Sequence, residues 1–349
     1  MKGRVLLVAY PLLPVSGRSA GGAEQILWTL ERELVRRGWE TAVVARAGSQ
    51  VSGELLEVGA KQCKKEMGPG HPEESFGEQV RELAERVEEA CARGRYDLVL
   101  DHSGHYFRDA GRVKERVLAT LHLPRTLYPA EAFEGLGKNV HFNFVSESQR
   151  LAFGDVMQTA GVIRNGIDAA RFAMNGRRGE YVLWLGRVCP EKAPHLAVAA
   201  AKLAGVPIVL AGQVYPFRWH EEYWERELRP LVDGDRVRWV AVPPFAEKAR
   251  LLREARALLV TSQVEETTSL VALEAMASGT PVIAFAVGAL REVVTGKTGL
   301  LVQTVEEMAA AISLVSAIRP QDCRERVEQD YSVKGMVDGY EKLIGELVG

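Results

Sequence analysis

Short apolar runs alternate with longer amphipathic segments along almost the whole chain. In the first half, the runs are rich in Val, Leu and Ile and occupy residues 5–9, 41–45, 98–101, 117–121 and 141–145. A strand that is buried on both faces has a continuous apolar sequence of this kind, and the segments between the runs are long enough for helices. The pattern therefore predicts an α/β fold with a parallel sheet covered on both faces.

The segment 23–37 shows how the sequence specifies the first helix. Ile26, Leu27, Leu30 and Leu34 recur at helical spacing, basic residues follow, and Gly38 provides a stop. We expect this helix to connect the first two strands.

The alternation restarts after a polar stretch at 165–180, which contains Asn165-Gly166, Asn175-Gly176 and the pair Arg177-Arg178. The second set of runs is 181–185, 207–211, 237–240, 257–260, 282–285 and 299–302. Because 349 residues exceed what one core usually covers, we expect two doubly wound domains, 1–165 and 166–330. The remaining segment, 331–349, is predicted to be a last helix with no strand after it. Length alone also permits one barrel-like domain.

The bulk properties exclude several classes of protein. The 44 basic and 46 acidic residues leave a formal net charge of -2, which argues against nucleic-acid binding. No apolar run approaches the roughly 18 residues that a membrane span requires, and the run at 5–13 is interrupted by Pro11 and followed by Pro14. We therefore expect no transmembrane segment, while peripheral membrane contact stays open. The widely spaced cysteines form no CxxC pair, so we interpret them as plain thiols of a cytoplasmic protein. They are Cys63, Cys91, Cys189 and Cys323.

Two cations follow the strand predicted at 181–185. Arg187 comes directly after it, and a loop then brings Lys192. Ligands of open parallel sheets bind beyond the carboxyl ends of the strands, where these two side chains could stabilise the charge that develops on a diphosphate leaving group. The alternative is a surface Arg and Lys, with Glu191 as an ion-pair partner.

The segment 265–276 carries two glutamates around a predicted helix start. Thr268 or Ser269 is a natural N-cap, which places Glu266 in the loop before the helix and Glu274 on its second turn. The free amides between them are suited to a phosphate, and the carboxylates could accept hydrogen bonds from ribose and sugar hydroxyls. Glu274 lies in an otherwise apolar helix, so a buried carboxylate needing a partner is expected. A simple capped helix is the alternative.

The segment from Glu266 to Ala284 resembles the signature of retaining glycosyltransferases of family 4, and Arg187 and Lys192 fall where that family binds phosphates. Further matches extend over nearly the whole chain: Gly21-Gly22, Asp101-His102-Ser103, Thr120-Leu-His122, Val145-Ser146 and Asn165-Gly166-Ile167-Asp168.

The resemblance implies the GT-B fold, in which two Rossmann-like domains face each other across a cleft. Domain 1–165 would lie on the acceptor side, 166–330 would bind the nucleotide sugar, and helix 331–349 would cross back to the first domain. The donor would be a UDP or GDP sugar, and anomeric configuration would be retained. Since Arg187 and Lys192 take a role often given to metal ions, we expect no metal and no cofactor.

The resemblance also implies residue roles. Glu266 would hold sugar hydroxyls, Glu274 the ribose, and His122 the sugar from the opposite domain. Glycines let a backbone approach a phosphate or acceptor closely. The remaining donor-binding candidates are Gly21, Gly22, Thr268, Ser269 and Leu270, and the acceptor candidates are Asp101 and His102.

The chain departs from the family pattern at several positions. Thr267 and Thr268 replace a Gly and an aromatic, Arg164 replaces a Pro, and Leu123 replaces an acidic residue after His122. The donor sugar and the acceptor therefore stay open. A nucleotide-sugar 2-epimerase and a non-catalytic sugar-nucleotide-binding module are the alternative functions.

Three other patterns support no separate site. Asp233-Gly-Asp235 precedes a strand, so a polar turn is expected there rather than a metal site. His102 and His105 have no third ligand at an established spacing. The aromatic residues of 215–224 are compatible with packing, base stacking or lipid contact.

Overall fold

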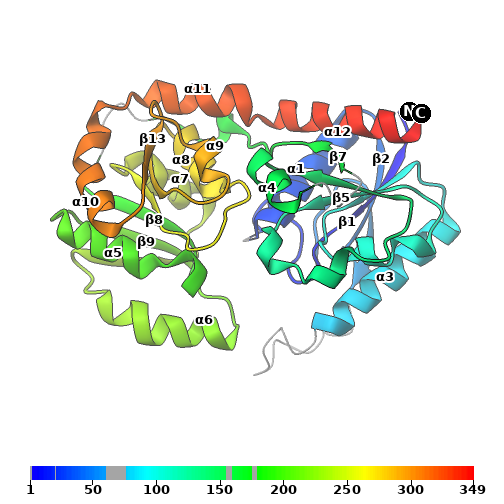
Figure 1. The fold of residues 1–349 in the computed structure, drawn as a ribbon, viewed down its shortest axis with the longest axis horizontal. Coiled ribbons are helices and arrows are strands. Elements are labelled where there is room, and N and C mark those ends of the chain that lie inside the picture. Colours follow the sequence, from blue (N-terminus) through cyan, green and yellow to red (C-terminus); the bar gives the residue numbers. More distant parts are fainter. Residues whose placement is uncertain (1, 20, 60–75, 155–158, 175–178) are drawn as a thin grey trace. The chain divides into compact units, whose positions relative to one another are not determined.

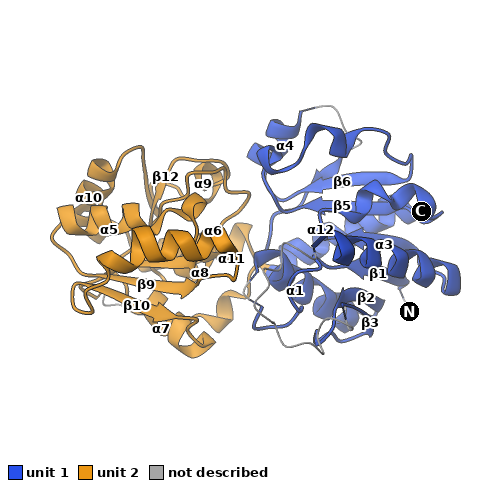
Figure 2. Cartoon of the chain, turned by 90° about the horizontal axis from the view of Figure 1, so that it is seen from below, with its two compact units in different colours: residues 1–166, 333–349 blue, residues 167–332 orange. Residues whose placement is uncertain are grey.

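The computed structural model describes residues 2–19, 21–59, 76–154, 159–174 and 179–349. The chain forms two compact units, one of residues 1–166 with 333–349 and the other of residues 167–332 (Figure 2). The turn Asn175-Gly176, the pair Arg177-Arg178 and Cys63 lie outside the described residues.

Unit 1 contains a seven-stranded parallel sheet in the order β3-β2-β1-β4-β5-β6-β7 (Figure 1). The strands are β1 Arg4–Val8, β2 Glu40–Arg46, β3 Glu54–Val58, β4 Leu98–Asp101, β5 Val117–Leu121, β6 Val140–Phe144 and β7 Thr159–Val162. Its helices are α1 Gly22–Arg36, α3 Phe76–Arg93, α4 Glu147–Phe153 and α12 Val333–Val348. The order places the switch in winding direction between β1 and β4, where ligands of this fold bind.

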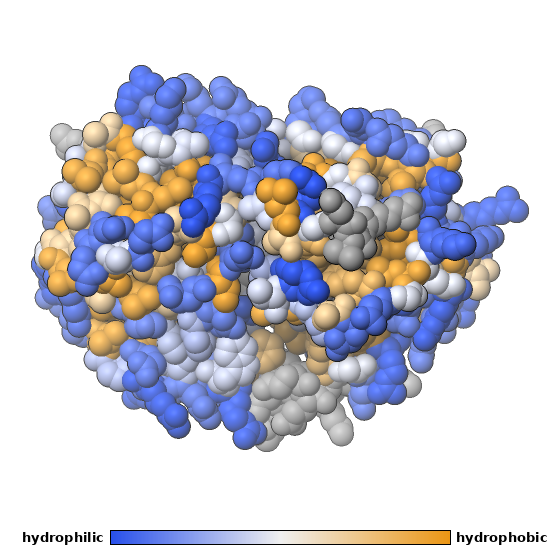
Figure 3. Space-filling view, in the orientation of Figure 1, coloured by the Kyte–Doolittle hydropathy of each residue, from blue (hydrophilic) through white to orange (hydrophobic). Residues whose placement is uncertain are grey.

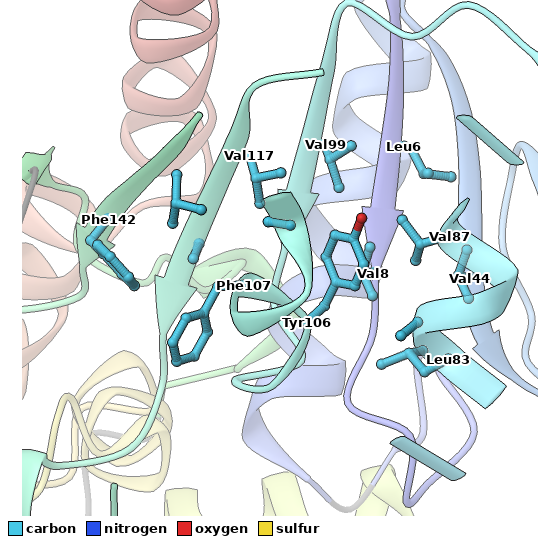
Figure 4. Close-up of a cluster of buried hydrophobic side chains, with 14 of the residues drawn as sticks. Leu6, Val8, Val44, Leu83, Val87, Val99, Tyr106, Phe107, Val117 and Phe142 are labelled. Atoms are coloured by element: carbon cyan, nitrogen blue, oxygen red, sulfur yellow. The ribbon is translucent and has the colours of Figure 1, made fainter. Parts of the chain in front are cut away.

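The core of unit 1 forms because strand side chains alternate between two covered faces. Leu6 and Val8 of β1 point to the face that α3 covers with Leu83 and Val87 (Figure 4). All four side chains are inaccessible to solvent, and burying each one contributes about 1.5–3 kcal/mol.

Helix α12 belongs to unit 1 although it ends the chain. Arg37 Nη1 lies 2.7 Å from Asp338 and 2.8 Å from Glu341, and the Trp39 indole donates to Glu341 at 2.8 Å. Met336, Val337 and other apolar residues of the helix are buried, so packing and ion pairs together hold α12.

Unit 2 repeats the same winding with a six-stranded parallel sheet in the order β10-β9-β8-β11-β12-β13. The strands are β8 Val182–Arg187, β9 Ile208–Gln213, β10 Val237–Ala241, β11 Leu258–Val260, β12 Val282–Phe285 and β13 Gly299–Val302. Its helices are α5 Pro194–Leu203, α6 Arg218–Tyr223, α7 Phe245–Glu254, α8 Leu270–Ala277, α9 Leu290–Val293, α10 Val305–Leu314 and α11 Pro320–Asp330.

Two apolar layers cover the faces of this second sheet. Leu183 and Leu185 of β8 pack with α7, α8 and α11, whereas Val182 and Trp184 of the same strand pack with α5 and α10. The continuous apolar run is therefore the sequence form of a strand buried on both faces. The expected α/β class, with two Rossmann-like doubly wound units, is confirmed.

The sequence missed only strands at the edge of the first sheet among those described. Glu54–Val58 and Thr159–Val162 form β3 and β7, which are the outermost strands of unit 1. Edge strands are partly exposed and mix polar with apolar residues, so they lack the run that marks a central strand.

The visible surface mixes polar and apolar side chains. Figure 3 shows hydrophilic and hydrophobic residues interspersed over this face of the molecule. Among the described residues, no helix combines the length and the apolar character that crossing a membrane requires.

Candidate functional site

The predicted residues of unit 2 gather at the carboxyl ends of β8 and β11, which are neighbours in the sheet. Arg187 is the last residue of β8, and the loop after β11 leads through Glu266 to α8. Since strand order changes direction between β8 and β11, this edge is where a doubly wound sheet presents its ligand site.

Lys192 and Glu266 form an ion pair at this edge. Lys192 Nζ lies 2.5 Å from Glu266 Oε1, and the Ser262 hydroxyl donates to the same oxygen. Burial would raise the pKa of the Glu266 carboxyl, but the charge and hydrogen bond of Lys192, the Ser262 hydroxyl and the charge of Arg187 outweigh it, so the pKa lies below its ordinary value. Glu266 is consequently ionised at neutral pH, and two cations balance it.

Backbone contacts fix the position of this pair. The Thr261 hydroxyl donates to the carbonyl of Lys192 at 2.8 Å, and the Gln263 amide donates to the carbonyl of Glu191 at 2.7 Å. The carbonyl of Glu266 accepts from the Ala289 amide.

Gly288 permits the last of these contacts. Its φ is +48°, and a Cβ there would lie 2.4 Å from the carbonyl oxygen of Glu266. A side chain at this position would therefore push the Glu266 loop away.

The start of α8 differs from the predicted cap. Ser269 precedes the helix, but its hydroxyl makes no capping hydrogen bond, and its φ of 70° places it in the left-handed region. The expected Ser or Thr side-chain cap at Ser269 is therefore wrong, because capping requires an extended backbone that this turn does not have. Among the described residues, the buried Ser269 hydroxyl has no hydrogen-bond partner.

An anion can accept hydrogen bonds from the backbone N–H groups at the start of α8. A helix start leaves its first N–H groups without an acceptor in the helix; in α8 the Ala272 amide already donates to the carbonyl of Ser269 at 3.1 Å, so the amides before Ala272 are the candidates for an anion. Ala193, directly after Lys192, also has a left-handed φ, of 44°. Non-glycine residues in this region cost about 1–3 kcal/mol each and concentrate at functional sites.

Glu274 lies on α8 with a partner that the sequence analysis did not identify. The residue is 6% exposed, and its carboxylate lies 2.6 Å from Nζ of Lys248, on α7. The expectation that this buried carboxylate needs a partner is met within the protein. Lys248 could have been suspected only from the contact of α7 with α8, which the sequence does not reveal.

Unit 1 brings two of its candidate residues into contact. His102 Nδ1 and His122 Nε2 lie 2.9 Å apart, immediately after β4 and β5. Burial lowers the pKa of His122 to about 4, and burial with the charge of His122 lowers that of His102. Both rings are therefore neutral at pH 7, and the nitrogen of one donates to that of the other.

Asp101 is held by its own loop. Its carboxylate accepts from the amide and hydroxyl of Ser103 and from the Phe107 amide at 2.9 Å. Burial raises the pKa of Asp101 to about 6 against these hydrogen bonds. The carboxylate has little capacity left for a ligand, which favours a role in shaping the loop that carries His102.

Gly21 and Gly22 lie at the start of α1, after β1. A Cβ on Gly21 would lie 2.0 Å from the Glu24 carboxylate, so the glycine makes room for that buried side chain. Burial raises the pKa of Glu24 to about 7, opposed by a hydrogen bond from its own backbone. Glu24 is a second residue that the sequence analysis missed.

Two sets of candidates are thus assembled within separate units. Unit 2 brings together Arg187, Lys192 and Glu266, while Thr268, Ser269 and Leu270 begin the helix that carries Glu274. Unit 1 holds Asp101 at the end of β4, His102 and His122 directly after the adjacent strands β4 and β5, and the two glycines after β1. The predicted turn at 233–235 is confirmed, because Asp233 accepts from the amides of Asp235 and Val237 before β10.

Comparisons with known proteins agree on one family. The family model described as glycosyl transferases, group 1, matches residues 179–317. The glycogen synthase of Mycobacterium tuberculosis is 33% identical over 199 residues, which cover 51% of this chain and 46% of that protein. The chain therefore spans about half the length of this relative.

Two further comparisons extend over almost the whole chain. The D-inositol 3-phosphate glycosyltransferase of Corynebacterium efficiens is 26% identical over 372 residues, covering 92% of this chain and 87% of that protein. The crystal structure of Anabaena HepE in complex with UDP-glucose matches with a TM-score of 0.74 and 17% identity, covering 99% of this chain and 100% of that one. This second likeness shows the fold.

Proposed function

Because the chain belongs to the group 1 glycosyltransferase family, we propose that it moves a sugar from a nucleotide-diphosphate donor to an acceptor hydroxyl and retains the anomeric configuration. The observation that carries the proposal is the Lys192–Glu266 ion pair beside Arg187 and the start of α8. Cations, helix amides and a carboxylate are the groups that a sugar diphosphate requires.

The diphosphate binds at the first turn of α8. Amides of Thr268, Ser269 and Leu270 donate to phosphate oxygens, and the positive end of the helix favours the negative charge. The buried Ser269 hydroxyl, which has no partner within the described structure, supplies one more donor. Arg187 and Lys192 complete the phosphate site from the β8 side.

The two glutamates recognise hydroxyls on either side of the diphosphate. Glu274 accepts from the ribose, with Lys248 orienting its carboxylate through their ion pair. Glu266 accepts from hydroxyls of the transferred sugar. Its low pKa supports this role, since an ionised carboxylate makes the stronger hydrogen bond.

The reaction proceeds on one face of the sugar without a protein nucleophile. The bond between the anomeric carbon and the diphosphate oxygen breaks, and the acceptor oxygen forms the new bond to that carbon. The acceptor proton passes to the departing phosphate. Arg187 and Lys192 stabilise the charge that develops on this leaving group, which is why turnover needs no divalent metal.

The residues of unit 1 serve the sugar and the acceptor. His122 contacts the transferred sugar, and His102 fixes the tautomer of His122 through their 2.9 Å hydrogen bond. Asp101 holds the loop after β4, and Gly21 and Gly22 let the backbone approach the ligand.

We propose UDP-glucose as the first donor to test, because HepE, which shares the fold, was crystallised with it. Binding of UDP-glucose, GDP-mannose, UDP and GDP is compared by thermal shift, since a ligand that binds the folded state raises the melting temperature. The donor that binds is then incubated with acceptors bearing free hydroxyls, and released nucleotide is measured with Lys192→Ala as the control.

Three outcomes separate the candidate functions. Nucleotide release that depends on an acceptor, together with a product that keeps the anomeric configuration of the donor, supports sugar transfer. An epimer of the donor formed without acceptor identifies a 2-epimerase. Binding of the donor with no release of nucleotide and no conversion of the sugar identifies a non-catalytic module.

Activity that EDTA abolishes and magnesium restores contradicts the metal-independent mechanism.

A further inference from the structure

A cysteine, a glutamate and a histidine converge in unit 2 beside the turn that carries Lys192. Cys189 and Glu191 flank the first residue of the 3-10 turn Pro190–Lys192, and His220 lies on α6. The Cys189 sulfur, a carboxylate oxygen of Glu191 and a ring nitrogen of His220 lie within 4.8 Å of one another.

Three polar atoms of this cluster lack hydrogen-bond partners within the described structure, whereas the Cys189 thiol donates to the carbonyl of Arg187 at 3.6 Å. His220 is completely buried, and neither Nδ1 nor Nε2 has a hydrogen-bond partner within the described structure; Oε2 of Glu191 has none either. Leaving a buried polar group unsatisfied costs about 1–3 kcal/mol. Three such atoms in one place indicate that something other than this chain satisfies them.

Three aromatic rings lie close to His220, and within the described structure none of them forms a hydrogen bond with its nitrogens. The ring centroids of Trp219, Phe217 and Tyr215 lie 3.9, 5.1 and 6.0 Å from that of His220. Burial, with the nearby charge of Arg187, lowers the pKa of His220 to about 4. The imidazole is therefore neutral, which is the form that binds a metal ion.

We propose that Cys189, Glu191 and His220 form a binding site for one divalent transition-metal ion of the zinc type. Sulfur and imidazole nitrogen are ligands that zinc and cobalt prefer, whereas magnesium requires oxygen ligands. Three protein ligands leave the fourth tetrahedral position to water.

The observed geometry requires a small adjustment. Ligand atoms of one tetrahedral zinc stand about 3.5 Å apart, since Zn–S and Zn–N bonds are about 2.3 and 2.0 Å long. The three side chains must therefore draw together by about 1 Å from their widest spacing. Binding releases the thiol proton of Cys189 to solvent.

Charge balance makes both anionic ligands necessary. Arg187 acts electrostatically on both His220 and Cys189. A dication close to this guanidinium is favourable only when the thiolate and the carboxylate together cancel its charge. Loss of either anion should therefore weaken binding more than the loss of one bond alone.

The ion would act as a clamp rather than as a reactant. It would join the turn between β8 and α5 to α6, and so restrict the segment from which Lys192 projects. The site does not depend on the proposed sugar transfer, and the ion takes no part in it.

The test uses the full chain, freed of metal with a chelator and then titrated with Zn²⁺ or Co²⁺ alone. We expect one ion per chain, a higher melting temperature with Zn²⁺, and a sulfur-to-cobalt charge-transfer absorption with Co²⁺. Cys189→Ser should abolish this absorption, and Glu191→Gln and His220→Gln should each weaken zinc binding at least about tenfold.

Cys323→Ser is the matched control, because Cys323 is another buried free cysteine of unit 2. This variant should retain the absorption and the zinc affinity. Absence of a cobalt–sulfur absorption in the unaltered chain, or its persistence in Cys189→Ser, overturns the proposal. Unchanged zinc affinity in Glu191→Gln, whose partly exposed side chain makes misfolding a poor explanation, overturns it as well.

Discussion

Replacing Glu274 with glutamine tests whether this carboxylate recognises the ribose. Glu274→Gln keeps the shape of a side chain that is 7% exposed among the apolar residues of α8. It removes the negative charge and leaves a neutral amide opposite Lys248, 2.6 Å away in the present structure. We expect weaker nucleotide binding and a moderate loss of stability.

The magnitude follows from the two interactions that change. A hydrogen bond to a charged group contributes about 1.5–3 kcal/mol, so nucleotide affinity should fall about 10- to 150-fold. Breaking a fully buried ion pair costs about 3–5 kcal/mol, but the Lys248 side chain is 19% exposed and can retain water. The stability loss should therefore stay nearer to about 1–3 kcal/mol, or several degrees in melting temperature.

Calorimetric titration with UDP, or with whichever nucleotide the thermal-shift panel selects, measures the effect. Lys248→Met is the control, because it removes the ion pair while leaving the carboxylate available to the ribose. Its stability should fall as in Glu274→Gln, yet its nucleotide affinity should fall less. A folded Glu274→Gln chain that binds nucleotide within about twofold of the unaltered chain refutes the ribose role.

Three further predictions concern the phosphate site, the buried acid of unit 1 and the histidine pair. Arg187→Ala and Lys192→Ala should each lower kcat about 30- to 1,000-fold, since removing one donor to a developing charge costs about 2–4 kcal/mol; a rise in KM with normal kcat at saturating donor would show that they bind only the ground state. Glu24 has a pKa of about 7 in the folded state, against an ordinary value of 4.5. Because the folded state holds this proton more tightly than the unfolded state, stability falls as the pH rises from 4.5 to about 7. Glu24→Gln should therefore match the unaltered chain at pH 4 and exceed it by up to about 3 kcal/mol at pH 8 in urea unfolding; equal stability at both pH values would mean that Glu24 is not buried as the acid. His102→Ala should slow transfer about 2- to 10-fold by releasing His122, and His102→Asn, whose amide can replace the ring nitrogen, should restore most of the rate; identical rates in the two variants would contradict a positioning role.

The sequence predicts elements whose pattern is local. Central strands such as 181–185 and 282–285 are apolar at every position because helices cover both faces. The edge strands Glu54–Val58 and Thr159–Val162 lack this pattern and were missed. The start of α8 was located correctly, but the conformation of Ser269 depends on how the preceding loop meets the helix.

Contacts between residues that are far apart in the sequence are the hardest feature to predict from it. Lys248 and Glu274 come from different helices, and His220 reaches Glu191 only because α6 folds back toward the turn after β8. Arg187, Lys192 and Glu266 could be grouped in advance because the carboxyl ends of parallel strands share one edge of the sheet. No equivalent rule pairs side chains on two helices without knowing how those helices pack.

The proposed function requires a diphosphate to bind between two cations and the first turn of α8. A crystal structure of the chain with bound UDP tests it most directly. We predict phosphate oxygens 2.7–3.2 Å from the amides of Ser269 or Leu270 and from the Arg187 and Lys192 side chains. A nucleotide bound elsewhere, with Lys192 still paired to Glu266 and no phosphate at the helix start, would contradict the account.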